Sequence, residues 1–283
     1  MNIYYVDGQF LPSDKAVIPV DDLAILRGYG VCDIMRTYEG KPYFLSEHIQ
    51  RLIRSAKETS LDLPWDTKEL ETIVLETLQR NKSIDEANIR IIVTGGSSTD
   101  FFTHQGNPRL IVMVTPIPPL PRQWYTKGIK VITQIQERSM PTAKVISYMP
   151  AAMALKKAKA QGAIEVLYLN GAQEALEGTT SNLFAFINGT LVTPKEHVLK
   201  GITRKLILSL GQKEFKVQER PLPISELLGA DEVFITGTNK GVVPVVQVDA
   251  HEIGNGLPGK NTQRIIGLIE NHARSFSEAS KTD

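Results

Sequence analysis

Two side chains with complementary chemistry stand in the stretch between residues 142 and 184. Lys144 follows a strand-like run and precedes Pro150, where a helix can begin. Glu177 lies further on, in a loop rich in glycine and hydroxyl side chains between two predicted strands. A lysine amine can hold an aldehyde, and a carboxylate can pair with a protonated ring nitrogen. The pair is typical of a site for an aldehyde cofactor with a ring nitrogen, although a lone lysine is more often a surface residue.

Two further segments could bind a phosphate group. Lys200–Arg204 opens a predicted helix, whose N-terminus offers N–H groups without intrahelical partners and the positive end of the helix dipole. Thr236–Asn239 follows a buried-looking strand and adds small hydroxyl donors. Each segment also has an ordinary interpretation, since Thr203 can be a helix N-cap and the second segment a turn. Arg51 lies on the polar face of a predicted helix, which by itself indicates a solvated position.

The remaining motifs support neither nucleotide nor metal chemistry. Gly254–Gly259 matches the glycine pattern of dinucleotide-binding loops letter for letter. However, it follows a predicted hairpin strand, and too little chain remains for a βαβ unit, so we interpret it as a loop. The five histidines show no ligand spacing and Cys32 is the single cysteine, so we predict no bound metal and no internal disulfide.

Composition and charge narrow the range of partners. The chain has 283 residues, of which 42% are hydrophobic and 22% charged, with a formal net charge of +1. This balance is typical of a soluble globular protein and gives no electrostatic basis for binding nucleic acid or an anionic membrane. No apolar run approaches the ~20 residues of a membrane span, and no leader opens the chain. We therefore predict a cytoplasmic protein that acts on small molecules.

Hydrophobic patterns predict an α/β (α+β) protein of two domains. Residues 1–115 combine a hairpin at Asp7-Gly8 with further strands and two amphipathic helices. Residues 116–121 contain four prolines and are predicted to link the domains. Residues 122–283 form the larger domain, which carries Lys144. The main strands and helices are expected at Val31 to Tyr38, Ile49 to Ala56, Leu70 to Leu78, Asn88 to Thr94, Leu110 to Val114, Val131 to Gln136, Glu232 to Thr236, Val242 to Val248 and Gln263 to Ala273.

Six ordered motifs extend over nearly the whole chain and give it a resemblance to a known family. They are Gly28–Asp33, Glu47–Leu52, Lys144 with Pro150, Glu177–Phe184, Lys200–Arg204, and Asp231–Phe234 followed by Gly237-Thr238 and Pro244-Val245. With these six motifs in this order, the chain resembles the fold-type IV pyridoxal-phosphate enzymes, the class IV aminotransferases. These include branched-chain aminotransferases, D-amino-acid transaminases and aminodeoxychorismate lyase. The resemblance implies a small α/β domain, a larger pseudo-barrel domain, pyridoxal 5′-phosphate as cofactor, and a homodimer with its active sites near the subunit interface.

The resemblance also implies a role for individual residues. Lys144 would form a Schiff base with the cofactor and then act as the base that moves the substrate proton. Glu177 would pair with the pyridine nitrogen, and Tyr148 would reach the ring hydroxyl. For Arg51, the resemblance places the polar face of its helix against a binding site instead of solvent. The phosphate would be held by Arg51, Ile202, Thr203 and Thr238, and further cofactor contacts would come from Thr180, Ser181, Asn182 and Gly237.

The residues expected to select the substrate depart from the known branches of the family. Where D-amino-acid transaminases have a tyrosine after the G-x-G turn, this chain has Cys32, and its Thr99–His104 loop contains no arginine. The K-x-G-G-N-Y motif of branched-chain enzymes is also missing, and Asn239-Lys240 replaces their two small residues. The spacing from Lys144 to Pro150 is similar to that of D-amino-acid transaminases.

Two arginines are candidates for a trap that binds the substrate carboxylate. Arg27 precedes the glycine turn, and Arg90 lies in the apolar strand Asn88–Thr94, where a buried guanidinium needs a partner. An internal salt bridge of Arg90 with Asp33 or Glu86 is the alternative interpretation.

We therefore predict transamination between a D-amino acid and a 2-oxo acid. The alternatives within the family are a branched-chain L-amino-acid aminotransferase and aminodeoxychorismate lyase, which needs no oxo-acid acceptor. A non-catalytic protein that keeps the fold is a further alternative, against which the intact Lys144 and Glu177 argue.

Overall fold

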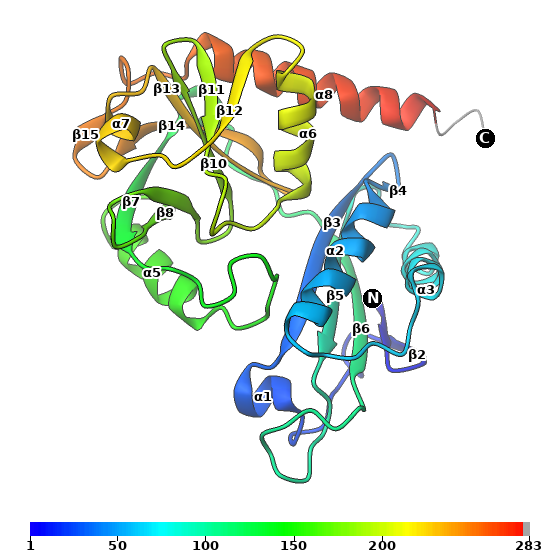
Figure 1. The fold of residues 1–283 in the computed structure, drawn as a ribbon. Helices are drawn as coiled ribbons and strands as arrows, with labels where there is room; N and C mark the ends of the chain where they lie inside the picture. Colours follow the sequence, from blue (N-terminus) through cyan, green and yellow to red (C-terminus); the bar gives the residue numbers. More distant parts are fainter. Residues whose placement is uncertain (280–283) are drawn as a thin grey trace. The chain divides into compact units, whose positions relative to one another are not determined.

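The chain forms two compact units in a computed structural model, which describes residues 1–279 (Figure 1). Unit 1 contains Met1–Pro118, the short segment Ala143–Tyr148 and the end of the last helix from Phe276 onward. Unit 2 contains Pro119–Thr142 and Met149–Ser275. Each unit has its own sheet and its own hydrophobic core.

Unit 1 is built on an antiparallel sheet of six strands in the order β2-β1-β6-β5-β3-β4. The hairpin at Asp7-Gly8 joins β1 to β2, and both turn residues have the positive φ that such a turn requires. The strands are β1 (Ile3–Val6), β2 (Gln9–Pro12), β3 (Gly30–Tyr38), β4 (Lys41–Pro42), β5 (Ala87–Thr94) and β6 (Arg109–Pro116).

Two amphipathic helices, α2 (Leu45–Glu58) and α3 (Thr67–Gln79), pack on one face of this sheet. Asp66 caps α3, because its carboxylate accepts from the N–H of Glu69 at 2.8 Å. A third, short helix, α1 (Leu23–Arg27), precedes β3. The core joins the helices to alternate strand residues and includes Ile49, Leu52, Leu70, Val74, Ile89, Ile91, Val93, Leu110, Val112 and Val114.

The segment Ala143–Tyr148, which carries Lys144, pairs with the beginning of β3. The N–H of Cys32 donates to the Lys144 carbonyl at 2.8 Å, and the N–H of Ile146 donates to the Gly30 carbonyl at 3.1 Å. The sequence predicts Lys144 in the C-terminal domain, whereas the structure places it in unit 1. A backbone pairing between segments so far apart in the chain cannot be predicted from the pattern of neighbouring residues.

Unit 2 is a nine-stranded sheet that closes on itself. Its main path is β12-β11-β10-β13-β14-β7-β8-β9, and β9 also pairs with β10 through Glu177 and Asn182. This closure confirms the predicted pseudo-barrel. The strands are β7 (Ile129–Ile135), β8 (Glu165–Leu169), β9 (Ala175–Gly178), β10 (Asn182–Ile187), β11 (Thr190–Thr193), β12 (Lys216–Glu219), β13 (Glu232–Gly237), β14 (Gly241–Val248) and β15 (His251–Glu252).

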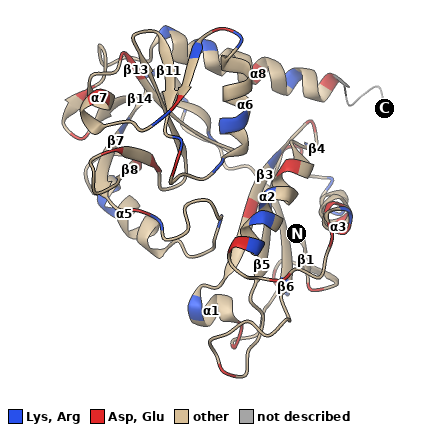
Figure 2. Cartoon of the chain, viewed as in Figure 1, with Lys and Arg blue, Asp and Glu red and all other residues tan. Residues whose placement is uncertain are grey.

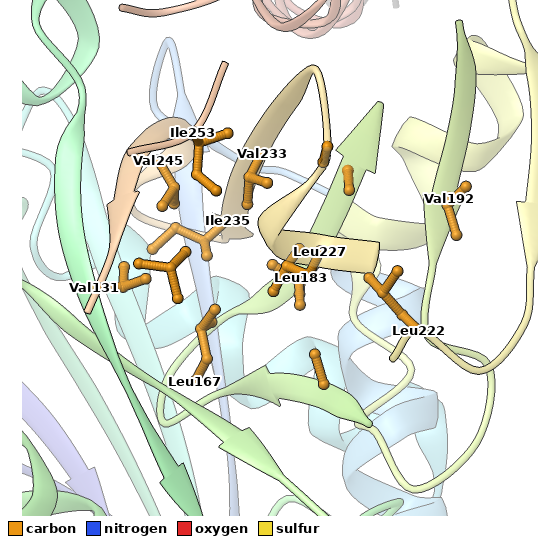
Figure 3. Packing of buried hydrophobic residues seen from close by; sticks show 14 of the residues in the cluster. Val131, Leu167, Leu183, Val192, Leu222, Leu227, Val233, Ile235, Val245 and Ile253 are labelled. Carbon is orange, nitrogen blue, oxygen red and sulfur yellow. The ribbon is translucent and has the colours of Figure 1, made fainter. Parts of the chain in front are cut away.

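The core of unit 2 consists of small and branched apolar side chains, most of them from the barrel strands. Figure 3 shows several of them, among them Val131, Leu167, Leu183 and Ile235, gathered between the strands. Their alternation along each strand follows from the two-residue period of β structure. Around the sheet lie α4 (Gln123–Thr126), α5 (Met149–Ala160), α6 (Ile202–Gly211), α7 (Ile224–Leu228) and α8 (Lys260–Ala279).

The loop Gly254–Gly259 leads into α8 and does not form a phosphate site. The N-terminus of α8 is already occupied by a carboxylate, because Glu232 accepts from the N–H groups of Asn261 at 3.0 Å and Thr262 at 2.6 Å. A side chain at Gly259 would collide with Glu232, which explains the last glycine of the pattern. The interpretation of this segment as a loop is confirmed.

Charged residues of both signs are interspersed over the helices and strands of both units (Figure 2). No helix within the described part of the chain is long and apolar enough to cross a membrane. Among residues 1–279, no cluster of three or more His, Cys, Asp or Glu side chains could hold a metal ion.

Candidate active site

Lys144 is held from both its backbone and its side chain. Its N–H donates to Ser55 Oγ of α2 at 3.0 Å, and its Nζ donates to the hydroxyl of Tyr148 at 3.2 Å. Burial by itself lowers the pKa of the Lys144 amine, but electrostatic interactions with Tyr148 and Cys32 outweigh it and raise the pKa above its usual value. In the cofactor-free chain the amine therefore carries a proton near neutral pH, which it must lose before it can attack an aldehyde.

Arg51 belongs to a buried group of three charged or polar side chains with Asp33 and His48. Its Nε and Nη2 donate to the two oxygens of Asp33 at 2.8 and 2.7 Å. His48 Nδ1 lies 2.7 Å from Asp33 Oδ1. Arg51 is only 5% exposed, so the interpretation of a solvated Arg51 is wrong. Its Nη1 makes no hydrogen bond within the described chain, which leaves one guanidinium nitrogen able to bind an anion.

The ionisation of this group is fixed by burial and by pairing. Burial alone would raise the pKa of Asp33, but Arg51 and His48 beside it hold that pKa well below its usual range. For His48, burial lowers the pKa more than the nearby Asp33 raises it. The group is therefore an ion pair between Asp33 and Arg51, oriented by a neutral histidine that donates its Nδ1 proton.

A pH dependence of stability follows from His48. Its pKa is lower in the folded chain than the ~6.5 of an unfolded histidine, so below about pH 6.5 the unfolded state binds the extra proton and stability falls. We expect the free energy of unfolding, measured with urea, to drop between pH 7.5 and 5.5. In His48→Gln, whose amide can still donate to Asp33, this drop should be smaller. An equal drop in both proteins would contradict the assignment.

Glu177 in unit 2 is held by partners on both of its oxygens. Its Oε1 accepts from Arg138 Nη2 at 2.5 Å, and its Oε2 accepts from the N–H of Leu199 at 3.0 Å and from Asn182 Nδ2 at 3.2 Å. Glu177 is 4% exposed. Arg138 also donates to the Pro141 carbonyl, so its guanidinium is oriented from two sides. A buried carboxylate with these partners has a fixed direction and a paired charge.

Asn182 links Glu177 to the segment that begins α6. Its Nδ2 donates to the Leu199 carbonyl at 2.8 Å as well as to Glu177. A side chain at Gly201 would collide with Asn182 Oδ1. Gly201, and not Thr203, is the N-cap of α6, so the N-cap interpretation of Thr203 is wrong. No side chain caps this helix, and its first N–H groups, those of Ile202 and Thr203, can bind an anion.

The hydroxyl side chains that follow Glu177 in the sequence form hydrogen bonds with a different acid. Thr179, Thr180 and Ser181 all donate their hydroxyl hydrogens to Glu165, a buried residue that the sequence analysis did not single out. For Thr180 and Ser181, predicted as cofactor contacts, the structure shows this internal hydrogen bond. Gly237 ends β13, and Thr238 begins the turn to β14.

Neither arginine of the predicted trap is buried. Arg27 lies at the end of α1, is exposed, and stands over the ring of Phe102 at 5.3 Å. Arg90 is also exposed, on the face of β5 opposite the core, so the premise of a buried guanidinium is wrong. The alternative salt bridge is not formed, since Asp33 pairs with Arg51 and Glu86 accepts from Thr37 and from the N–H of Glu39.

Comparison with known proteins decides the family. The profile of the family described as Amino-transferase class IV matches residues 30–248. This chain belongs to that family. A protein of Methanocaldococcus jannaschii, provisionally named a branched-chain-amino-acid aminotransferase, is 35% identical over 92% of this chain and 93% of its own length. The D-alanine aminotransferase of Bacillus licheniformis is 30% identical, with 98% of each chain covered.

The fold of this class IV aminotransferase is similar to solved structures of the same family. A branched-chain amino acid aminotransferase of the organism abbreviated T.th., crystallised with pyridoxamine 5′-phosphate, has a TM-score of 0.89 and 28% sequence identity. The similarity covers 96% of this chain and 94% of that one. The predicted fold class, a fold-type IV enzyme, is confirmed.

Proposed function

We propose that this class IV aminotransferase moves the amino group of a D-amino acid to a 2-oxo acid. The observation that carries the proposed carboxylate site is that two exposed arginines, Arg27 and Arg90, form no ion pair within residues 1–279, so both guanidinium groups can bind a carboxylate. The similarity to D-alanine aminotransferases supports the choice of a D-amino acid. The second candidate, a branched-chain L-amino-acid aminotransferase, is favoured by the relative from Methanocaldococcus jannaschii.

The cofactor is pyridoxal 5′-phosphate, on which class IV aminotransferases depend. The chain fits it, because α6 offers uncapped N–H groups behind Gly201, where no side chain has room, and Arg51 keeps Nη1 for an anion. Ile202, Thr203, Thr238 and Arg51 would hold the phosphate. When bound, the cofactor supplies an aldehyde carbon that exchanges amines and a ring that accepts electrons.

The residues of this chain would then transfer the substrate proton and stabilise the charge on the pyridine ring. Lys144 Nζ would hold the aldehyde of the cofactor, and as a free amine it would move the proton of the substrate Cα. Tyr148, which accepts from Lys144 Nζ, orients that amine. Glu177, fixed by Arg138 and Asn182, would pair with the pyridine nitrogen and keep it protonated. As in the resemblance, we propose a cytoplasmic homodimer with its active sites near the subunit interface.

A half-reaction tests the proposed substrate. The cofactor-loaded enzyme is mixed separately with D-alanine, D-glutamate and L-leucine, without any oxo acid, and its visible absorption is followed. Loss of the visible band with a D-amino acid alone supports the proposal. Loss with L-leucine alone would make the protein a branched-chain enzyme, and no change with any of the three would favour aminodeoxychorismate lyase.

The proposed trap predicts a specific kinetic change. In Arg90→Ala, KM for the D-amino acid should rise at least about tenfold while kcat changes little, because a charged contact to the carboxylate is made in the ground state as well as in the transition state. Steady-state kinetics with D-alanine measure both constants. The matched control is Arg54→Ala, an exposed arginine on α2, which should leave KM as it is. An unchanged KM in Arg90→Ala would remove Arg90 from the trap.

A further inference from the structure

Glu165, the first residue of β8, is a buried acid whose carboxylate accepts hydrogen bonds from several donors. It is 1% exposed. Its Oε1 accepts from the N–H groups of Val166 at 3.0 Å and Thr179 at 3.2 Å, and from the Thr179 hydroxyl. Burying an isolated carboxylate costs several kcal/mol, so a structure keeps one only where such donors compensate for the lost water.

The other oxygen of Glu165 completes a set of donors from one loop. Oε2 accepts from the Thr180 hydroxyl at 2.8 Å and N–H at 3.3 Å, and from the Ser181 hydroxyl at 3.0 Å. A side chain at Gly178 would collide with Ser181 Oγ and press on Glu165. All three hydroxyls between Glu177 and Asn182 therefore donate to a single carboxylate, which determines the path of the loop.

Lys240 ties a second turn to the same carboxylate. Its Nζ donates to Glu165 Oε2 at 3.2 Å and to Thr180 Oγ1 at 2.9 Å. Its carbonyl accepts from the Tyr125 hydroxyl at 2.9 Å, so the backbone of the turn is fixed as well. Lys240 lies in the turn between β13 and β14, which also carries Thr238. The Thr238 turn and the Glu177 loop are thus joined through one ion pair.

Glu165 carries its negative charge near neutral pH. Burial alone would raise the pKa of Glu165, but the Lys240 ammonium and the hydroxyls of Thr179 and Thr180 hold that pKa below its usual value. The Lys240 side chain is 20% exposed and its partner 1%, so solvent screens the pair weakly. Neither Glu165 nor Lys240 needs to contact the cofactor in order to act.

We propose that Glu165 and Lys240 are positioning residues, which hold the Glu177 loop and the Thr238 turn in one fixed arrangement for the pyridine and phosphate ends of the cofactor. This inference rests on the proposed roles of Glu177 and Thr238. Its physical basis is preorganisation, since donors that are already in place lose no conformational freedom when the ligand binds.

The experiment compares Lys240→Met, which keeps the length of the side chain and removes its charge, with the wild type. The full chain, freed of cofactor, is titrated with pyridoxal 5′-phosphate to obtain Kd, and Tm is measured without cofactor. We expect Kd to rise at least about tenfold in Lys240→Met, with Tm within a few degrees of the wild type. Lys240→Arg should restore most of the affinity, and Lys156→Met, an exposed lysine on α5, should leave Kd unchanged.

A second readout separates positioning from simple stabilisation. Thr238→Val should also weaken binding, and the double variant with Lys240→Met should lose less affinity than the two single losses combined, because the lysine acts through the turn. A lower Tm with an unchanged Kd would overturn the inference, as would strictly additive losses. If the wild type itself does not bind pyridoxal 5′-phosphate, the proposed function fails instead. Glu165→Gln repeats the test from the other side of the ion pair.

Discussion

Replacing Lys144 by alanine should lower the rate of transamination by about 10⁴-fold or more. In the proposed function the amine has two tasks, to hold the aldehyde of the cofactor and to move the substrate proton, and a positioned acid–base group alone contributes up to about 10⁴-fold. The measurement is a single-turnover reaction with D-alanine on the loaded enzyme. Lys144→Arg should be almost as inactive, because a guanidinium keeps the charge but neither forms the bond nor accepts the proton at neutral pH.

A matched control separates this loss from a loss of fold. Lys156→Ala removes an exposed lysine from α5 and should keep full activity. Far-ultraviolet circular dichroism and Tm of Lys144→Ala should remain close to the wild type, because the Lys144 backbone, and not its side chain, bonds to Cys32 and Ser55. Activity of Lys144→Ala within tenfold of the wild type would exclude Lys144 as the reacting amine.

The second large effect concerns stability. Asp33→Ala should lower the free energy of unfolding by about 3–5 kcal/mol, because it leaves the buried guanidinium of Arg51 without its counter-charge. Urea denaturation of the cofactor-free chain at pH 7.5 measures the change. At this pH Asp33 is ionised in both the folded and the unfolded state, so the loss reports the broken pair directly.

Two comparisons make this result specific. Asp66→Ala removes another aspartate of unit 1, the cap of α3, and should cost only about 1 kcal/mol. The double variant Asp33→Ala/Arg51→Met should be more stable than the sum of the single effects predicts, because it no longer buries an unpaired charge. A loss below about 1 kcal/mol in Asp33→Ala would contradict the pairing seen in the structure.

Local patterns predicted the regular elements closely. The alternating run expected at Asn88 to Thr94 is β5, which begins one residue earlier, and the run expected at Val31 to Tyr38 is β3. The expected helix from Gln263 to Ala273 is the middle of the longer α8. Strand alternation and helix periodicity depend on neighbouring residues alone, so one sequence is enough to locate them.

Contacts between residues far apart in the sequence could not be predicted in this way. A helix wheel places Arg51 on a polar face of α2. In the structure Arg51 is buried and paired with Asp33, which lies on the separate strand β3. Glu165 left one weak signal, a single acid at the head of the otherwise apolar strand β8. Apart from the N–H of the neighbouring Val166, its donors lie in a loop and a turn 14 to 75 positions away, so no local pattern predicts them.

The return of Ala143–Tyr148 to unit 1 has a consequence for how the protein is made. On the ribosome, the N-terminal sheet emerges before the segment that pairs with the start of β3, so the N–H of Cys32 has no backbone acceptor until Lys144 has left the exit tunnel. A gene fragment that stops at the proline-rich linker therefore encodes an incomplete unit. The placement of Lys144 and the completion of unit 1 depend on the same backbone pairing, so a single crossover at the linker would separate β3 from the segment that it pairs with.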